Sequence, residues 1–184
     1  MATKSYNFNA DPTKDFFISM LVRDINLSDA IGDLVDNSVD AANEHLNNKS
    51  KKVYKIHITT DKEEFKIEDN CGGIEIDRAK KYAFKFGKPS GEPFKNYSTG
   101  QFGIGMKRAF FKIGNTIAVK SVAKNSEFLI NIKVKEWREK KAWDFELNSF
   151  KENLPTVSAT RRGTHITIEN LNNDSEISFN SDLF

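Results

Sequence analysis

Hydrophobic and polar residues alternate with helical spacing in the first quarter of the chain. Successive residues advance by about 100° around a helix, which groups the polar side chains of Asp33, Asp36, Asn37, Asp40 and Glu44 on one face. The opposite face has the width of a core-facing stripe and carries Ile31, Leu34, Val35, Ser38 and Ala42. The pattern predicts an amphipathic helix with Ser28 as its N-cap, fading around 45–49. A shorter helix is expected before it, over 15–23.

The rest of the chain combines strands with two further helices. Apolar residues predict strands near 53–58, 65–67, 115–123, 126–135, 142–147 and 164–169. Helices are expected over 77–86 and 105–113. Residues 87–101 carry two prolines and three glycines, which predicts a long loop. Helices first and a sheet afterwards indicate an α+β protein: a two-layer α/β sandwich whose mixed, mostly antiparallel sheet has helices on one face.

Composition and charge exclude several classes of protein. The 184 residues fit one domain, and 28 Lys and Arg against 26 Asp and Glu give no charge excess that points to nucleic acid or a membrane surface. The lone Cys71 excludes an internal disulfide. No apolar run approaches the ~20 residues of a membrane span, so we expect a cytoplasmic protein without a membrane partner. Polar residues 172–184 are expected to be a linker to a further C-terminal region.

The acidic helix face contains a candidate ligand pair. Asn37 is a poor helix former, and it lies four residues after Asp33. Oxygen atoms at this spacing can hold a Mg²⁺ ion and a water between them. The alternative is an acidic face that is merely solvated.

The segment 67–74 suggests a second wall of a ligand site. A strand ends at Asp69 and the chain turns through Gly72 and Gly73. A carboxylate there can accept a hydrogen bond from an exocyclic amine, and glycines let a flat ring approach the backbone. An ordinary turn is the alternative.

The segment 98–114 suggests a third wall. Gly100, Gly103 and Gly105 lead directly into a helix, and Lys107 adds a positive charge. Amide groups at a glycine turn and a helix N-terminus suit a phosphate. The spacing fits neither a Walker A loop nor a dinucleotide fingerprint.

Together these segments resemble the GHKL superfamily of ATPases, which includes DNA gyrase B, heat-shock chaperones, histidine kinases and MutL. Residues 33–37 (DLVDN) are similar to its N box and 69–73 (DNCGG) to its Asp-x-Gly-x-Gly box. Residues 100–105 (GQFGIG) resemble its glycine-rich motif, and 162–171 (RGTHITIENL) its late Gly-Thr strand. The resemblance implies a Bergerat-type ATP-binding domain over 1–171, with an ATP lid at 87–101. In motif style it is nearest to MORC-like and uncharacterised prokaryotic members.

The resemblance also implies the ligands, ATP and Mg²⁺, and the roles of individual residues. Asn37 would coordinate Mg²⁺, Asp69 would accept from the adenine amino group with support from Thr164, and Asp33 occupies the general-base position. The other ATP-binding positions it implies are Ala41, Gly73, Ile74, Gly100, Gln101, Phe102, Gly103, Ile104, Gly105, Met106 and Lys107.

Two residues depart from the family pattern. Asp33 stands where the family usually has Glu, and a carboxylate that is one methylene shorter can slow hydrolysis without loss of binding. Cys71 replaces the first glycine of the second box, which a negative φ would allow. We expect Cys71 to be a small buried residue and not a redox centre.

The implied function is a Mg²⁺-dependent ATPase that acts as a conformational or dimerisation switch within a larger protein. The client, protein or nucleic acid, is not indicated. Two alternatives stay open: a nucleotide-binding regulatory module with little or no hydrolysis, and a phosphotransfer domain of the histidine-kinase type.

Overall fold

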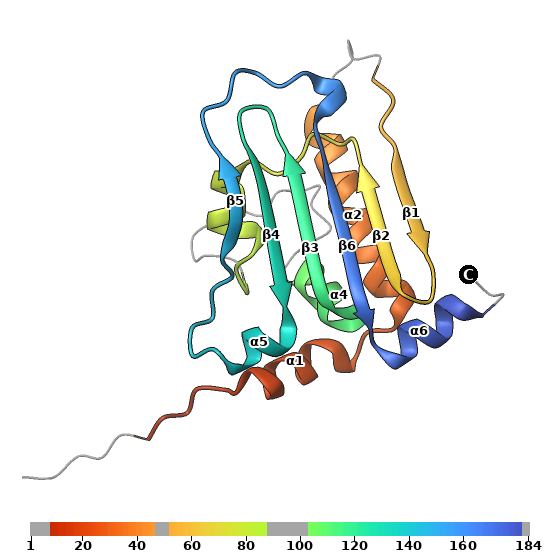
Figure 1. Cartoon of the computed structure of the whole chain (residues 1–184), viewed down its shortest axis with the longest axis vertical. Helices are drawn as coiled ribbons and strands as arrows, with labels where there is room; N and C mark the ends of the chain where they lie inside the picture. The colour runs from red at the N-terminus through yellow and green to blue at the C-terminus, as the bar shows by residue number, and fades with distance from the viewer. Residues whose placement is uncertain (1–7, 47–51, 88–102, 182–184) are drawn as a thin grey trace, which may run out of the picture.

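A single antiparallel sheet organises the molecule (Figure 1). The computed structural model describes residues 8–46, 52–87 and 103–181. Its six strands lie in the order β1-β2-β6-β3-β4-β5, and every described pairing is antiparallel. The strands are β1 (Ile56–Thr60), β2 (Glu64–Asp69), β3 (Gly114–Val122), β4 (Glu127–Lys133), β5 (Leu147–Lys151) and β6 (Gly163–Leu171).

Helices cover one face of this sheet, which confirms the expected α+β class. Helices α2 and α4 run behind the sheet in Figure 1, while α1, α5 and α6 lie along its lower end. The helical elements are α1 (Lys14–Arg23), α2 (Leu27–His45), α3 (Ile76–Arg78), the π-helix η1 (Ala79–Ala83), α4 (Gly105–Ile113), α5 (Val134–Glu139), the 3-10 turn η2 (Ala159–Arg161) and α6 (Asn173–Asn180). No helix in the described ranges is long and apolar enough to cross a membrane.

The core lies between the sheet and the helices. Alternate strand residues point into it, so Phe65 of β2 and Ile117 of β3 are fully buried. From the other layer, Leu34 of α2 and Phe110 of α4 contribute side chains that are 1 % exposed. The core therefore fixes α2 and α4 against the strands that carry the predicted ligand residues.

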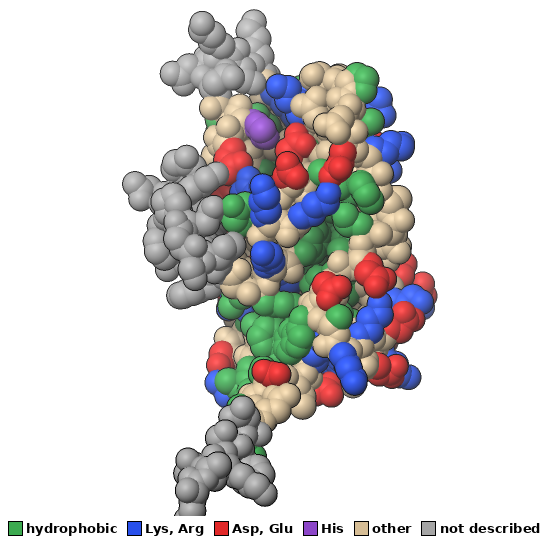
Figure 2. All heavy atoms as spheres, turned by 90° about the vertical axis from the view of Figure 1, so that its left-hand side faces the viewer, with side chains coloured by type: hydrophobic (Ala, Val, Ile, Leu, Met, Phe, Trp, Pro, Cys, Tyr) green, Lys and Arg blue, Asp and Glu red, His purple; other side chains and the backbone are tan. Residues whose placement is uncertain are grey.

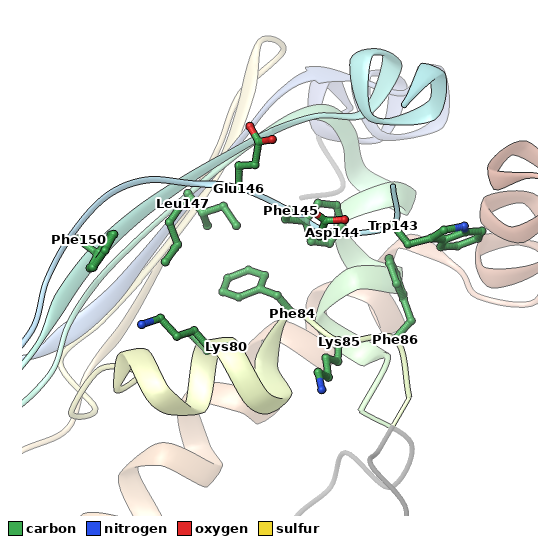
Figure 3. Close-up of a pocket in the computed structure, with 12 residues that line it drawn as sticks. Lys80, Phe84, Lys85, Phe86, Trp143, Asp144, Phe145, Glu146, Leu147 and Phe150 are labelled. Carbon is green, nitrogen blue, oxygen red and sulfur yellow. The ribbon is translucent and has the colours of Figure 1, made fainter. Parts of the chain in front are cut away.

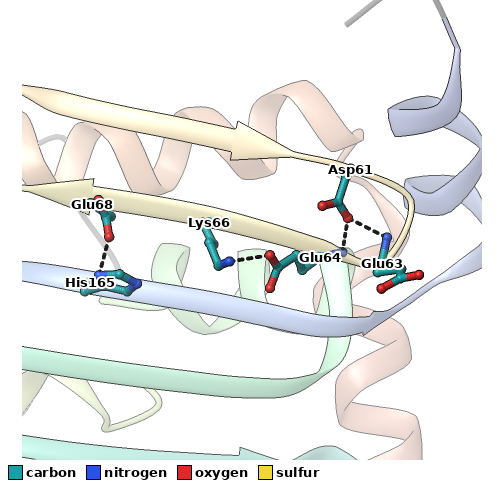
Figure 4. Close-up of polar contacts among 6 residues, drawn as sticks. All are labelled: Asp61, Glu63, Glu64, Lys66, Glu68 and His165. Carbon is teal, nitrogen blue, oxygen red and sulfur yellow. Dashed lines mark hydrogen bonds and ion pairs between the residues drawn. The ribbon is translucent and has the colours of Figure 1, made fainter.

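The opposite face of the sheet is polar (Figure 4). Nδ1 of His165 on β6 lies 2.5 Å from a carboxylate oxygen of Glu68 on β2, and Lys66 pairs with Glu64 along β2. Asp61 closes the turn before β2 by accepting the backbone N–H groups of Glu63 and Glu64, at 2.7 and 2.9 Å. This pattern is typical of an antiparallel sheet with one solvated face.

The predicted helices at the site are largely correct, with one error of capping. Helix α4 has the expected bounds, and α2 ends at His45. However, α2 begins at Leu27 and its N-cap is Asn26, not Ser28, because the Asn26 side chain accepts the N–H of Asp29 at 2.7 Å. The helix expected over 77–86 begins at Ile76 and becomes a π-helix.

Two strand predictions are wrong beyond Lys133. The strand expected over 126–135 ends there because Val134 and Trp137 bury one side of helix α5. The strand expected over 142–147 begins only at Leu147. Between α5 and β5, backbone carbonyls bind a distant side chain. The buried ammonium of Lys14 donates hydrogen bonds to the carbonyls of Trp137, at the end of α5, and of Lys140 and Ala142, at 2.6 to 2.7 Å. At least those of Lys140 and Ala142 are thereby withdrawn from strand pairing.

Residues 172–184 were expected to be a linker, but 173–180 form helix α6. Ser175 and Phe179 are buried on its inner side. The ring of Phe179 stacks on that of Phe65, with centroids 6.0 Å apart. This helix is therefore packed onto the end of the sheet.

Candidate functional site

The first wall of the candidate site is the face of α2. Ala30, Leu34 and Ser38 are buried at four-residue spacing, which turns Asp33 and Asn37 toward the edge of the core. The side-chain amide of Asn37 donates to the backbone carbonyl of Asp33 at 2.7 Å. One of its two N–H donors is thereby used, and its carbonyl oxygen is the atom that can bind a cation.

Negative charge accumulates along the same face. Partial desolvation, followed by the charges of Asp40 and Asp33, raises the pKa of Asp36. The second and third of these causes show that the carboxylates of Asp33, Asp36 and Asp40 lie close enough along α2 to repel one another. A cation is therefore electrostatically favoured beside α2. No cluster of three or more His, Cys, Asp or Glu suited to a metal ion occurs in 8–46, 52–87 or 103–181.

The second wall is built around Asp69 at the end of β2. Its Oδ2 accepts the hydroxyl of Ser38 at 2.8 Å. Its Oδ1 accepts the N–H of Cys71 at 2.8 Å and that of Thr164 at 3.2 Å. Three donors thus fix the carboxylate, and among the described residues Oδ2 accepts one donor, which leaves it capacity for a second. Strand β6 brings Thr164 to Asp69 across 95 residues of sequence.

The glycines after Asp69 allow close packing of the backbone. Gly73 has a φ of 74°, and a Cβ there would lie 2.1 Å from the carbonyl oxygen of Val122. Any side chain at this position would therefore clash. The next residue, Ile74, is half-buried and donates its N–H to Ser121 Oγ at 2.7 Å.

Cys71 occupies the site as a buried, unreactive residue. It is 1 % exposed, and burial raises the pKa of its thiol to about 11. The only described non-glycine residues with positive φ are Asn153 and Asn170, so Cys71 has the negative φ that its position requires.

The third wall is the start of α4. Gly103 has a φ of 65°, and Ile104 is an N-cap without a capping side chain. The first amide groups of α4, beginning at Gly105, therefore receive no capping hydrogen bond from the N-cap side chain. Such amides can receive an anion.

Two predicted residues of α4 lie deeper than expected. Met106 is 8 % exposed and belongs to the hydrophobic core. Lys107 is 2 % exposed, and its ammonium donates to the carbonyl of Ala83 at 2.8 Å and to that of Gly103. In this arrangement Lys107 joins the end of η1 to the glycine turn, and a phosphate contact would require it to leave both carbonyls.

Arg108 and Ser38 are site residues that sequence reasoning missed. Nε and Nη2 of Arg108 donate to Oδ2 of Asp33 at 3.0 and 2.7 Å. The presence of Ser38 on an apolar helix face was the only sequence indication of its contact with Asp69. Nothing in the sequence marks Arg108 apart from its position next to Lys107.

The structure thus links Asp33 and Asn37 on α2 to Asp69 and Thr164 on the sheet, through the contact of Ser38 with Asp69. The contact of Arg108 with Asp33 links the same helix to the start of α4. Ala41 lies half-buried farther along α2. Gly100, Gln101, Phe102 and the predicted lid at 87–101, except Gly87, lie outside the described residues.

A separate hollow of about 840 Å³ lies between η1 and β5 (Figures 2 and 3). Its walls are mainly apolar, and Phe84 points into it (Figure 3). None of the predicted ATP-binding residues lines it. It is therefore distinct from the site built by α2, β2 and α4.

Comparison with known proteins identifies the family of the chain. A family model described as histidine kinase-, DNA gyrase B-, and HSP90-like ATPase matches residues 25–164. That range includes every predicted site residue, from Asp33 to Thr164. No curated protein matched the chain.

Proposed function

We propose that this chain, which belongs to the family of histidine kinase-, DNA gyrase B- and HSP90-like ATPases, binds ATP with Mg²⁺ between α2, the turn after β2 and the start of α4, and hydrolyses it. The single observation that carries this proposal is the Asp69 carboxylate, fixed by Ser38, Cys71 and Thr164 with acceptor capacity remaining. Such a carboxylate is preorganised to accept an amino group of a base.

Adenine fits the proposed acceptor because its exocyclic amine is a donor. The φ of 74° at Gly73, which glycine adopts readily, sets the path of the turn over which we place the flat ring. We infer that Thr164 acts by orienting Asp69 through its backbone N–H. Phosphates would then lie toward the uncapped amides of α4.

The donor set on α2 suits Mg²⁺. Asn37 offers an oxygen whose orientation is set by its contact with the Asp33 carbonyl, and Mg²⁺ takes oxygen ligands from few protein groups together with phosphates and water. When bound, the ion would offset the charge of the phosphates. The neighbouring negative charges of Asp33, Asp36 and Asp40 on α2 support a cation at this position.

We assign the general base to Asp33. Its carboxylate would accept a proton from water while the water oxygen bonds to the γ-phosphorus. The bond from that phosphorus to the β–γ bridging oxygen breaks, and ADP leaves with the electron pair. General-base catalysis contributes roughly 10²–10⁴-fold. Nucleotide turnover would drive a conformational or dimerisation switch in a larger protein.

Phosphate release by wild type, Asp33→Ala and Asp33→Glu tests the proposal. We expect Asp33→Ala to lose at least about 100-fold in kcat and Asp33→Glu to retain activity. Asp29→Ala is a matched control, because Asp29 is an exposed carboxylate on the same helix. It should retain the wild-type rate.

Other results would select another function. Equal background rates in all variants, with ATP still bound, would indicate a regulatory module without hydrolysis. Transfer of label from γ-labelled ATP to a protein would indicate phosphotransfer.

A further inference from the structure

Arg108 connects the start of α4 to the catalytic face of α2. Two of its N–H groups converge on a single oxygen of Asp33, Oδ2, at 3.0 and 2.7 Å. The Arg108 and Asp33 side chains are 33 % and 22 % exposed, so the pair lies at the rim of the site. Two charge-assisted N–H···O contacts on one oxygen hold that oxygen more tightly than a single contact does.

Asp33 is confined from two other directions. A Cβ at Gly105 would lie 3.2 Å from the Asp33 carboxyl carbon, so the carboxylate rests against the first turn of α4. The side chain of Asn37 holds the Asp33 backbone carbonyl. Oδ2 is engaged by Arg108, whereas no donor among the described residues is recorded on Oδ1.

We propose that Arg108 is a positioning residue for Asp33: by holding Oδ2, its guanidinium presents Oδ1 to the attacking water. The inference rests on the proposed hydrolysis by Asp33. The χ2 torsion of an Asp carboxylate is soft, and the short Asp side chain has little reach to compensate for a wrong rotation. A guanidinium with two donors on one oxygen restricts that rotation, whereas an ammonium would supply charge without the same geometry.

Steady-state phosphate release by Arg108→Ala and Arg108→Lys tests this role. Arg108→Ala should lower kcat by about 10- to 100-fold, because misplacement of a reacting group is costly, while KM changes by less than about 3-fold. Arg108→Lys should recover part of kcat. Lys112→Ala removes a charge from the same helix, one turn away and beside Asp174, and should match wild type.

The outcomes separate the two proposals. An unchanged or increased kcat in Arg108→Ala, with normal wild-type turnover, overturns the positioning role alone. A rise in KM that parallels the fall in kcat, with a lowered Tm, also overturns it and indicates a structural role. A wild type without turnover overturns the proposed hydrolysis and the positioning role with it.

Discussion

At the scale of the residue, Lys107 shows how the fold can change the role of a charged side chain. Its position after the glycine motif suggested a phosphate contact. In the structure its ammonium is buried and joins the carbonyls of Ala83 and Gly103. Burial lowers the pKa of Lys107 to about 8, from an ordinary lysine value of 10.5.

This lowered pKa predicts a pH-dependent stability. Between pH 8 and 10.5 the unfolded chain keeps a proton on Lys107 that the folded chain has lost, so the contribution of Lys107 to the free energy of unfolding rises with pH. From pH 7 to 10, wild type should gain about 2 kcal/mol relative to Lys107→Met. Denaturant unfolding at several pH values measures this gain.

Lys120→Met is the control, because Lys120 is exposed on β3. The gain of wild type over Lys107→Met between pH 7 and 10 should exceed its gain over Lys120→Met. Equal gains over the two variants would show that Lys107 titrates alike in the folded and unfolded chain.

At the scale of the element, local patterns predicted α2 and α4 because a helix is specified by residues three and four apart. Helix α5 was missed because its formation rests on the burial of Val134 and Trp137. The late start of β5 was missed because the carbonyls of Lys140 and Ala142 bind the ammonium of Lys14, more than 120 residues away. Helix α6 was missed because most of its residues are polar and one aromatic side chain, Phe179, packs it against the core.

The site residues also divide into those that are close in sequence and those that meet only in the folded chain. Asp33 and Asn37 could be found as a pair on one helix. The meeting of Asp69 and Thr164 could be expected only from the family resemblance, since it depends on the pairing of β2 with β6. Arg108 could not be found, because its partner lies 75 residues away on another helix.

Helix α6 is expected to stabilise the sheet without affecting the nucleotide. Phe179→Ala removes a ring that is 8 % exposed and stacked on Phe65, and should lower the free energy of unfolding by about 3 kcal/mol. Ile177→Ala on the same helix, where the residue is 70 % exposed, should change it by less than about 0.5 kcal/mol. Equal losses in both variants would contradict the packing of α6, and ATP affinity should stay at the wild-type value in both.

At the scale of the whole molecule, the proposed switch predicts a change of assembly. Light scattering should give the monomer mass without nucleotide and twice that mass with a non-hydrolysable ATP analogue and Mg²⁺. Nucleotide shifts such an equilibrium only if it binds the dimer more tightly than the monomer. A monomer under both conditions would rule out nucleotide-driven dimerisation of residues 1–184.

The central claim is that the Asp69 carboxylate holds the adenine amino group of ATP. Titration calorimetry of the wild type with ATP and with GTP, and of Asp69→Asn with ATP, tests this claim most directly. Adenine presents an amino donor where guanine presents a carbonyl acceptor, so the Asp69 carboxylate should favour ATP over GTP by at least about 100-fold. Asp69→Asn, verified to be folded by its Tm, should weaken ATP binding by a similar factor. If ATP and GTP bind equally, or if ATP affinity survives in Asp69→Asn, the nucleotide is not held at the end of β2 as proposed.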